Sequence, residues 1–166
     1  AYSSGFKLEG ALNLVKEADK GALAGLANTK DVLEALVSVM HSYGMSADQA
    51  AHINDVFLKT VQDGVITMPQ LSRYIGQAVT IAPELGVALE DVAGAYVAMT
   101  RQGLNAAEST TAINAVLKQF LDPSTEASKY AQELGINLSK SAFEGKNFGE
   151  VIKDIAQKVE IGRAHV

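Results

Sequence analysis

Apolar residues recur at spacings of three and four along most of this chain, and capping residues or glycines separate the stretches that carry them. One such stripe consists of Val32, Leu36, Val37, Met40 and Tyr43. This period is typical of amphipathic helices that bury one face. No stretch alternates apolar and polar residues between hairpin turns, so we predict no sheet. The sequence therefore predicts an all-α fold.

Short polar motifs mark where the helices begin. A side-chain oxygen at the N-cap and a Glu or Gln three residues later bind each other's backbone N–H groups. Thr67 is followed by Pro69, a residue favoured in a first helical turn, and Asn28 or Thr29 can cap an earlier helix. The capping pairs are Ser46 with Gln49, Asn105 with Glu108 and Asn147 with Glu150.

The predicted helix ends share one device, a Gly followed directly by an apolar residue. Glycine adopts the left-handed conformation at little cost, and the next residue can fold back onto the last helical turn. We expect a compact, irregular stack of about seven to eight short antiparallel helices joined by Gly-containing turns. No strict repeat length is visible, which disfavours a regular solenoid. The four pairs are Gly44-Met45, Gly86-Val87, Gly103-Leu104 and Gly135-Ile136.

The chain divides into four parts by these signals. Residues 1–27 form a helical N-terminal segment, interrupted near Gly21 or Gly25, which we expect to be truncated. Residues 28–138 form the helical core, and residues 139–159 a loop and a final helix. Residues 160–166, EIGRAHV, resemble the translation of a sequencing adapter, so we expect the natural sequence to end near Val159. The alternative is a genuine helix end.

Composition excludes several classes of function. Hydrophobic residues make up 48% of the chain and charged residues 20%, which indicates a globular fold. The net charge is −5 and the basic residues are scattered, so we predict no direct nucleic-acid site. There is no Cys, hence no disulfide and no thiolate metal site. No apolar stretch is long enough to span a bilayer.

The histidines and glycines nominate no metal or phosphate site. His41 and His52 lie on different predicted helices without a carboxylate at ligand spacing, and His165 falls in the suspected adapter. We expect His41 and His52 to face solvent. Asp63-Gly64 lacks the oxygen ligands of a calcium loop and fits a helix end better. The glycines at 21, 25, 94 and 103 form no phosphate-binding pattern.

The hydroxyl and carboxylate residues also suggest structural roles. Ser72, Ser109, Thr110 and Thr111 lie in predicted helices without a neighbouring base. Glu90-Asp91 falls in a first helical turn, where negative charge complements the helix dipole. We therefore predict no catalytic, cofactor-binding or metal-binding residue, no cofactor, and no enzymatic activity.

The segment from Asp31 to Ile136 resembles the core domain of tail tape measure proteins from long-tailed bacteriophages and prophages. The resemblance rests on the order of its elements and on no catalytic signature. At Ser109 to Asn114 this chain has STTAIN where the family often has a small Ala-Gly step. The matching elements are the Gly44-Met45 turn, the Asp55-Val56 helix, a helix start with Leu71, the Pro-x-x-Gly segment Pro83 to Gly86, the Ala-rich helix ending at Gly103, the helix end at Leu121-Asp122-Pro123 and the turn Leu134-Gly135-Ile136.

The resemblance implies a structural role in tail assembly and tail-length determination. It implies as partners other tape measure copies, tail chaperones and the tail tube protein, with the virion tail and the host bacterial cytoplasm during assembly as locations. Two alternatives remain: a helical protein-binding adaptor, and a non-catalytic domain of a larger enzyme. An adaptor gene would end close to these residues, whereas a tape measure gene would continue far beyond them.

Longer-read sequencing of the source DNA across both ends tests these expectations. We expect the frame to run on for hundreds of codons among tail genes, with natural sequence in place of EIGRAHV. A natural stop directly after Val166 with no tail genes nearby would contradict the assignment and leave only the helical fold.

Overall fold

The computed structural model describes residues 7–164, with side-chain burial described as far as residue 160. No strand occurs in this range, and the predicted all-α fold is confirmed. Short 3₁₀ helices are η2 (Ala47–Gln49), η3 (Ala82–Leu85) and η4 (Lys140–Phe143). The α-helices are α1 (Leu8–Gly25), α2 (Thr29–Tyr43), α3 (Ala50–Asp63), α4 (Met68–Ala78), α5 (Leu89–Arg101), α6 (Ala106–Leu121), α7 (Thr125–Glu133) and α8 (Phe148–Ala164).

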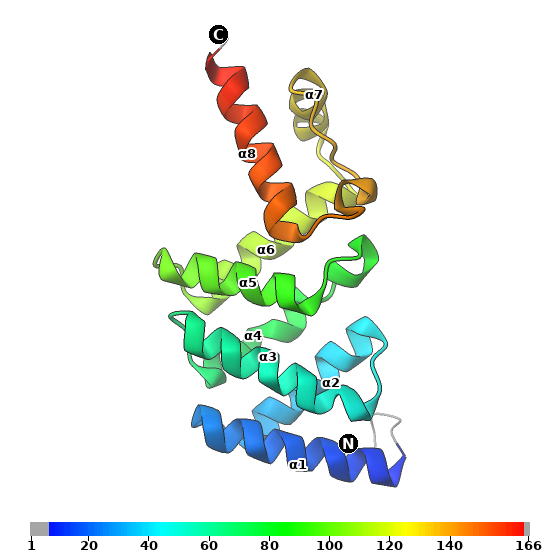
Figure 1. Ribbon diagram of the computed structural model, residues 1–166, viewed down its shortest axis with the longest axis vertical. Coiled ribbons are helices and arrows are strands. Elements are labelled where there is room, and N and C mark those ends of the chain that lie inside the picture. The colour runs from blue at the N-terminus through cyan, green and yellow to red at the C-terminus, as the bar shows by residue number, and fades with distance from the viewer. Residues whose placement is uncertain (1–6, 165–166) are drawn as a thin grey trace.

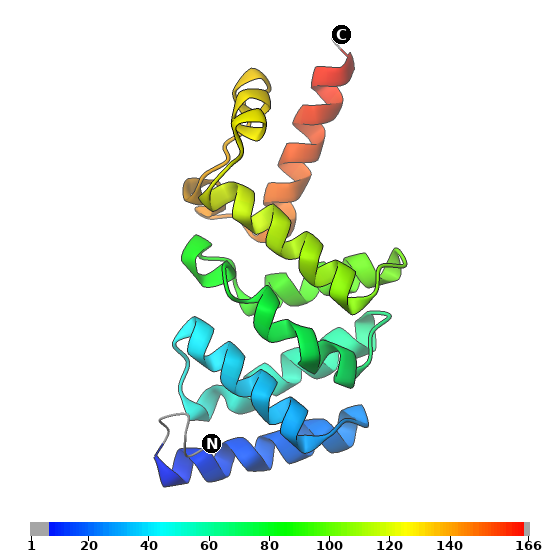
Figure 2. The ribbon, with the colours of Figure 1, turned by 180° about the vertical axis from the view of Figure 1, so that it is seen from behind.

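The first six α-helices stack along the long axis of the molecule as two rows. Helices α1, α3 and α5 form the row nearer the viewer in Figure 1, and α2, α4 and α6 form the row seen from behind in Figure 2. Within each row neighbouring helices pack on each other, α1 on α3 on α5 and α2 on α4 on α6. The chain alternates between the rows, so each helix pair adds one layer. Helices α7 and α8 extend beyond the last layer (Figure 1).

The layers recur at a similar interval along the sequence. Helices α1, α3 and α5 begin at residues 8, 50 and 89, and α2, α4 and α6 at residues 29, 68 and 106. An interval of about 40 residues is typical of stacked helical repeats. The stack is thus more regular through α6 than the sequence indicated. The helix starts recur at this interval, but the residues at corresponding positions differ. The repeat is therefore not visible in the sequence.

The predicted caps begin the helices. Capping boxes form at η2, α4 and α6, and Asn28 rather than Thr29 caps α2. At α8 the Asn147 side chain accepts the Glu150 N–H at 2.9 Å, and the Glu150 carboxylate accepts the Asn147 N–H at 2.9 Å. Each pair satisfies backbone donors that a helix start leaves without a partner.

The four glycine turns have the predicted conformation. Gly44, Gly86, Gly103 and Gly135 have φ angles of 65°, 74°, 97° and 63°. The apolar residue after each one donates its N–H to the carbonyl five residues earlier, for example Met45 to Met40 at 2.9 Å and Ile136 to Ala131 at 2.7 Å. This is the hydrogen bond of a Schellman motif. At Gly86 the turn closes the 3₁₀ helix η3 rather than a long helix.

The N-terminal helix ends at Gly25, one of the two interruption points that the sequence indicated, and it is not interrupted at Gly21. Helix α1 continues to Gly25, and Gly21 is buried inside it. A Cβ atom at Gly21 would lie 2.1 Å from Asn54 Oδ1 on α3. The Asn54 Nδ2 atom donates to the Glu17 carbonyl of α1 at 2.9 Å. Gly21 therefore allows a close approach of two helices instead of breaking one.

Polar contacts within and between the layers fix how the helices are aligned. Buried Thr100 in α5 accepts the Val65 N–H after α3 at 3.1 Å. The Tyr96 hydroxyl in α5 bonds the Thr110 hydroxyl in α6, and burial raises the pKa of Tyr96 to about 12. An unpaired buried polar group is costly, so a register that breaks such pairs is disfavoured.

Helix α8 runs through residue 160 without a break and ends at Ala164. Helical geometry does not depend on where a coding sequence came from. The adapter origin of residues 160–166 therefore stays a prediction, and its last two residues lie outside the described range.

Replacing Gly21 with Ala tests the close approach of α1 and α3. We expect Gly21→Ala to lower the free energy of unfolding by about 1–3 kcal/mol, because the new methyl group displaces the Asn54 amide from its bond to Glu17. Thermal and urea unfolding followed by circular dichroism measure the change.

Gly94→Ala is the matched control. Gly94 also lies inside a helix, α5, but a Cβ there meets nothing within 4 Å. The Gly94→Ala variant should have a free energy of unfolding about 0.5–1 kcal/mol higher than wild type, because Ala has the higher helix propensity. Equal responses of the two variants would contradict a packing role for Gly21.

Candidate interaction surfaces

The two histidines with described positions have different surroundings. His41 lies exposed in the last turn of α2. His52 on α3 places Nε2 2.7 Å from Glu90 Oε1 on α5, and both side chains are about half exposed. These residues are 38 positions apart in the chain, so the pair could not be predicted from the sequence. His165 lies outside the described residues.

The pairing of His52 with Glu90 links two layers and brings in no third ligand. In the described part of the chain, no group of three His, Cys, Asp or Glu side chains could hold a metal ion. A metal site needs three or four protein ligands converging on one point. The arrangement can form a solvent-exposed ion pair, which contributes little to stability.

Glu90 and Asp91 point to different partners and do not form a carboxylate pair. Glu90 contacts His52, whereas Asp91 Oδ2 accepts the backbone N–H of Phe148 at 3.2 Å. Phe148 is the first residue of α8, whose N–H groups lack helical partners. Asp91 thus fixes the start of α8 against α5. The two residues are 57 positions apart in the sequence, so this contact could not be predicted from the sequence alone.

Asp63 and Gly64 end α3, as the sequence indicated. Gly64 is the C-cap of α3, and its N–H donates to the Thr60 carbonyl at 2.9 Å. The Lys59 ammonium lies 2.7 Å from Asp63, and its hydrogen bond holds the pKa of that carboxyl below its usual range. Among the described residues, no group of three His, Cys, Asp or Glu side chains that could hold a metal ion includes Asp63.

Three of the four hydroxyl residues singled out in the sequence are buried in the helix packing, and the fourth, Thr111, is exposed. Ser72 and Ser109 are buried, and the Thr111 hydroxyl donates to the Ala107 carbonyl at 3.0 Å. Thr110 bonds Tyr96 in the core.

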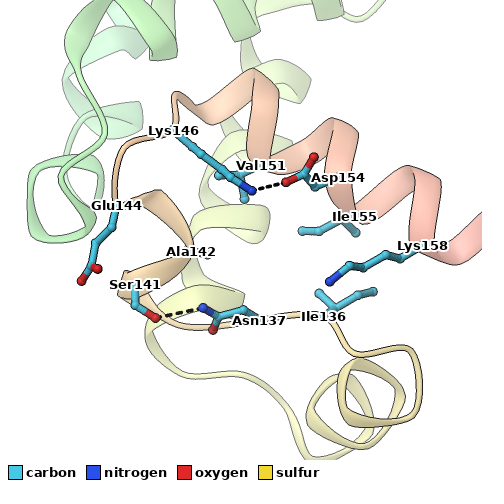
Figure 3. A pocket seen from close by; sticks show the side chains of 10 residues that line it. All are labelled: Ile136, Asn137, Ser141, Ala142, Glu144, Lys146, Val151, Asp154, Ile155 and Lys158. Carbon is cyan, nitrogen blue, oxygen red and sulfur yellow. Dashed lines mark hydrogen bonds and ion pairs between the residues drawn. The ribbon is translucent and has the colours of Figure 1, made fainter.

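A small hollow lies between η4, the turn after α7 and the inner side of α8 (Figure 3). Its volume is about 170 Å³. The Lys146 ammonium pairs with the Asp154 carboxylate across it, and the Asn137 amide donates to Ser141 Oγ at 2.9 Å. The Lys158 ammonium donates to the Gly135 carbonyl. These polar groups already bind each other. Their contacts therefore hold α8 in place and leave few polar groups for a ligand.

A second, more apolar groove separates α5 and α8. Its volume is about 460 Å³, and Glu90 and Asp91 stand at its edge. The apolar lining of this groove suits an apolar side chain of a partner protein rather than a polar substrate. The apolar lining residues are Ala95, Ala98, Met99, Val116, Phe148 and Ile152.

Comparison with known proteins identifies the chain. The family described as "Phage-related minor tail protein" matches residues 1–161. The chain belongs to this family. The resemblance to tail tape measure proteins is therefore confirmed, and this member of the family is a structural protein of the phage tail.

Two curated relatives carry the corresponding name. The "Tape measure protein" of Pneumococcus phage Dp-1 is 26% identical over 104 residues, which cover 63% of this chain and 9% of the relative. The "Probable tape measure protein" of Escherichia phage P2 is 24% identical over 142 residues, covering 86% of this chain and 17% of the relative. The chain thus spans less than a fifth of either relative. No solved structure matches it.

Among the described helices, none combines the length and the hydropathy needed to cross a membrane.

The Lys146–Asp154 pair predicts a measurable titration. The hydrogen bond from Lys146 is the largest cause of a pKa of Asp154 below its ordinary value of 3.8. A lowered pKa in the fold means that the pair stabilises the fold above the unfolded-state pKa, and that this effect is lost as pH falls through the folded value. In NMR titration we expect Lys146→Ala to return the pKa of Asp154 toward 3.8.

Lys153→Ala is the control for that titration. Lys153 is adjacent to Asp154 in the chain but contributes the smallest effect on its pKa. Its removal should change the Asp154 titration less than the removal of Lys146 does. Equal titrations in wild type and Lys146→Ala would show that the ion pair does not form in solution.

Proposed function

We propose that this chain is a non-catalytic structural segment of a tape measure protein and acts in tail assembly and tail-length determination. The observation that carries the proposal is the family match over residues 1–161, joined to a fold of stacked helix pairs. The names of the two curated relatives support it. The charged and hydroxyl groups described above serve helix capping, layer packing and surface ion pairs.

The fold suggests how such a segment contributes to length. Packed helices lie about 8–10 Å apart, so one layer of about 40 residues adds roughly 10 Å. The same residues in one continuous helix would extend about 60 Å. A stacked segment is therefore a compact folded body, and most of the length in a longer parent would come from segments that are not stacked in this way.

The proposed partners are other tape measure copies, tail chaperones and the tail tube protein. Apolar surface on α1 and in the groove between α5 and α8 offers contact area for such proteins. The net charge of −5 disfavours direct contact with nucleic acid. Assembly would take place in the host bacterial cytoplasm, and the assembled segment would reside in the virion tail.

We further propose the domain organisation expected from the sequence. Residues 28–138 would be the tape-measure-like core, with residues 1–27 a preceding helical segment and residues 139–159 a loop and final helix. The packing of α1 on both α2 and α3 joins the first two parts into one body.

Tail assembly in a phage that carries this gene tests the proposal. Leu36 is fully buried in α2, so Leu36→Asp should unfold the stack. We expect this variant to give few tails or tails of altered length in electron micrographs, with the segment missing from purified virions by mass spectrometry.

The variant that combines His41→Ala with His52→Ala is the control for chemistry. It removes the imidazoles with described positions and leaves the core intact, so we expect tails of normal number and length. Normal tails in Leu36→Asp would contradict a structural role. Loss of tails in the histidine variant, with the fold retained by circular dichroism, would contradict a non-catalytic one.

A further inference from the structure

Helix α7 buries far fewer residues than the helices of the stack do. Each of the helices α2 to α6 buries five or six residues, whereas α7 buries only Ala131. The largest side chain of α7, Tyr130, is 62% exposed. An isolated helix shorter than about 12–15 residues is marginal in water, and α7 has nine residues. The helical state of α7 therefore depends on a small number of contacts.

Both ends of the excursion that carries α7 are anchored to the body of the molecule. The chain leaves the body after Phe120 in α6 and returns at Phe143 in η4, and both of these side chains are buried. Their ring centroids lie 4.7 Å apart, and the Phe143 ring also stacks on that of Phe148 at 6.3 Å. Figures 1 and 2 show α7 projecting beyond the last layer. Because these rings hold the two ends of the excursion together, α7 can move without moving the stack or the start of α8.

Among the described residues, two hydrogen bonds join residues 124–136, here called the α7 strap, to other helices. At the start of the strap, the Ser124 N–H donates to Gln119 Oε1 of α6 at 3.1 Å. At its end, the Lys158 ammonium of α8 donates to the Gly135 carbonyl. A cation at the C-terminal end of a helix interacts favourably with the last carbonyls and with the helix dipole. Lys158 therefore holds the end of the strap to α8.

The strap also covers part of the apolar side of α8. Ile136, at the end of the strap, lines the hollow of about 170 Å³ together with Val151 and Ile155 of α8 (Figure 3). Ile136 and Ile155 are both half-buried. A strap that moved away would take Ile136 out of this hollow and leave Ile155 without this neighbour. The position of the strap thus decides whether this side of α8 is closed or open.

We propose that the α7 strap opens and closes against α8 as a unit of its own, with Lys158 as its latch, while the stack of α1 to α6 stays folded. Segments that bury little apolar surface open at a lower free energy than the core and can open separately from it. The closed state keeps Ile136 beside Ile155, and the open state exposes both. This inference follows from the fold and goes beyond the proposed function, on which it does not depend.

Hydrogen exchange of the purified chain, measured by mass spectrometry, tests the strap. Relative to their unfolded rates, the backbone amides of α7 should exchange on the order of a hundredfold or more faster than those of α2, because they need only a local opening. Low concentrations of urea should accelerate exchange in α2 more than in α7, since opening the strap exposes little surface. Circular dichroism confirms that the chain is folded under these conditions.

The Lys158→Met variant tests the latch, because it removes the ammonium and retains most of the aliphatic side chain. We expect exchange in α7 to become about threefold faster or more, the typical net contribution of one hydrogen bond, and exchange in α2 to stay unchanged. Lys153→Met is the matched control. Lys153 is also exposed on α8, but it donates no hydrogen bond to the strap in the described structure, so this variant should keep the wild-type exchange of α7.

Two results would overturn the proposal. Exchange in α7 at the rate of α2, with the same dependence on urea, would show that α7 unfolds only with the whole molecule. Equal exchange of α7 in wild type and Lys158→Met would show that Lys158 does not hold the strap. Neither result bears on tail formation by Leu36→Asp, so failure of this inference is distinguishable from failure of the proposed function.

Discussion

Helices in successive layers can pack on each other only because their backbones approach closely at a few small residues. At Gly21 and Gly25 of α1, an added Cβ would lie 2.1 Å from Asn54 Oδ1 and 2.5 Å from Met68 Cβ. At Gly76 of α4 it would lie 3.0 Å from Ser38 Cβ of α2. Small residues at these positions let one layer of helices pack directly on the next. Larger ones would separate the layers and open voids in a core that contains no Trp.

Once the layers are this close, the polar contacts between them become geometrically possible. Asn54 reaches the Glu17 carbonyl, Thr100 reaches the Val65 N–H, and Asn114 donates to the Gln77 carbonyl at 3.2 Å. Each bond joins helices whose residues are more than 30 positions apart. The result is a body whose layers have a fixed alignment, which suits a structural part of a phage tail. Its unsatisfied requirement is at α1, where one apolar face has no neighbour in the described chain.

The local features of the fold could be predicted because they depend on neighbouring residues alone. The capping box of Asn105 with Glu108 and the left-handed turn at Gly44 are formed by residues within a few positions of each other. The surfaces could not be predicted in the same way. His52 with Glu90 and Asp91 with the Phe148 N–H join residues 38 and 57 positions apart. Nothing in a helical period specifies which exposed residues of two separate helices will meet.

The helical character of this chain, the places where most helices begin and end, and the family resemblance could all be inferred from the sequence, because period, caps and glycine turns are encoded locally. Other features became visible in the folded structure. It showed that Gly21 lies inside a helix and not at a break, because the reason for that glycine is the side chain of Asn54 on another helix. It also showed that the helices stack as pairs at a similar interval, and that the leucines on the outer side of α1 are exposed among the described residues. These properties follow from which faces meet in space, and a linear pattern of apolar residues does not record which of two apolar faces will find a partner.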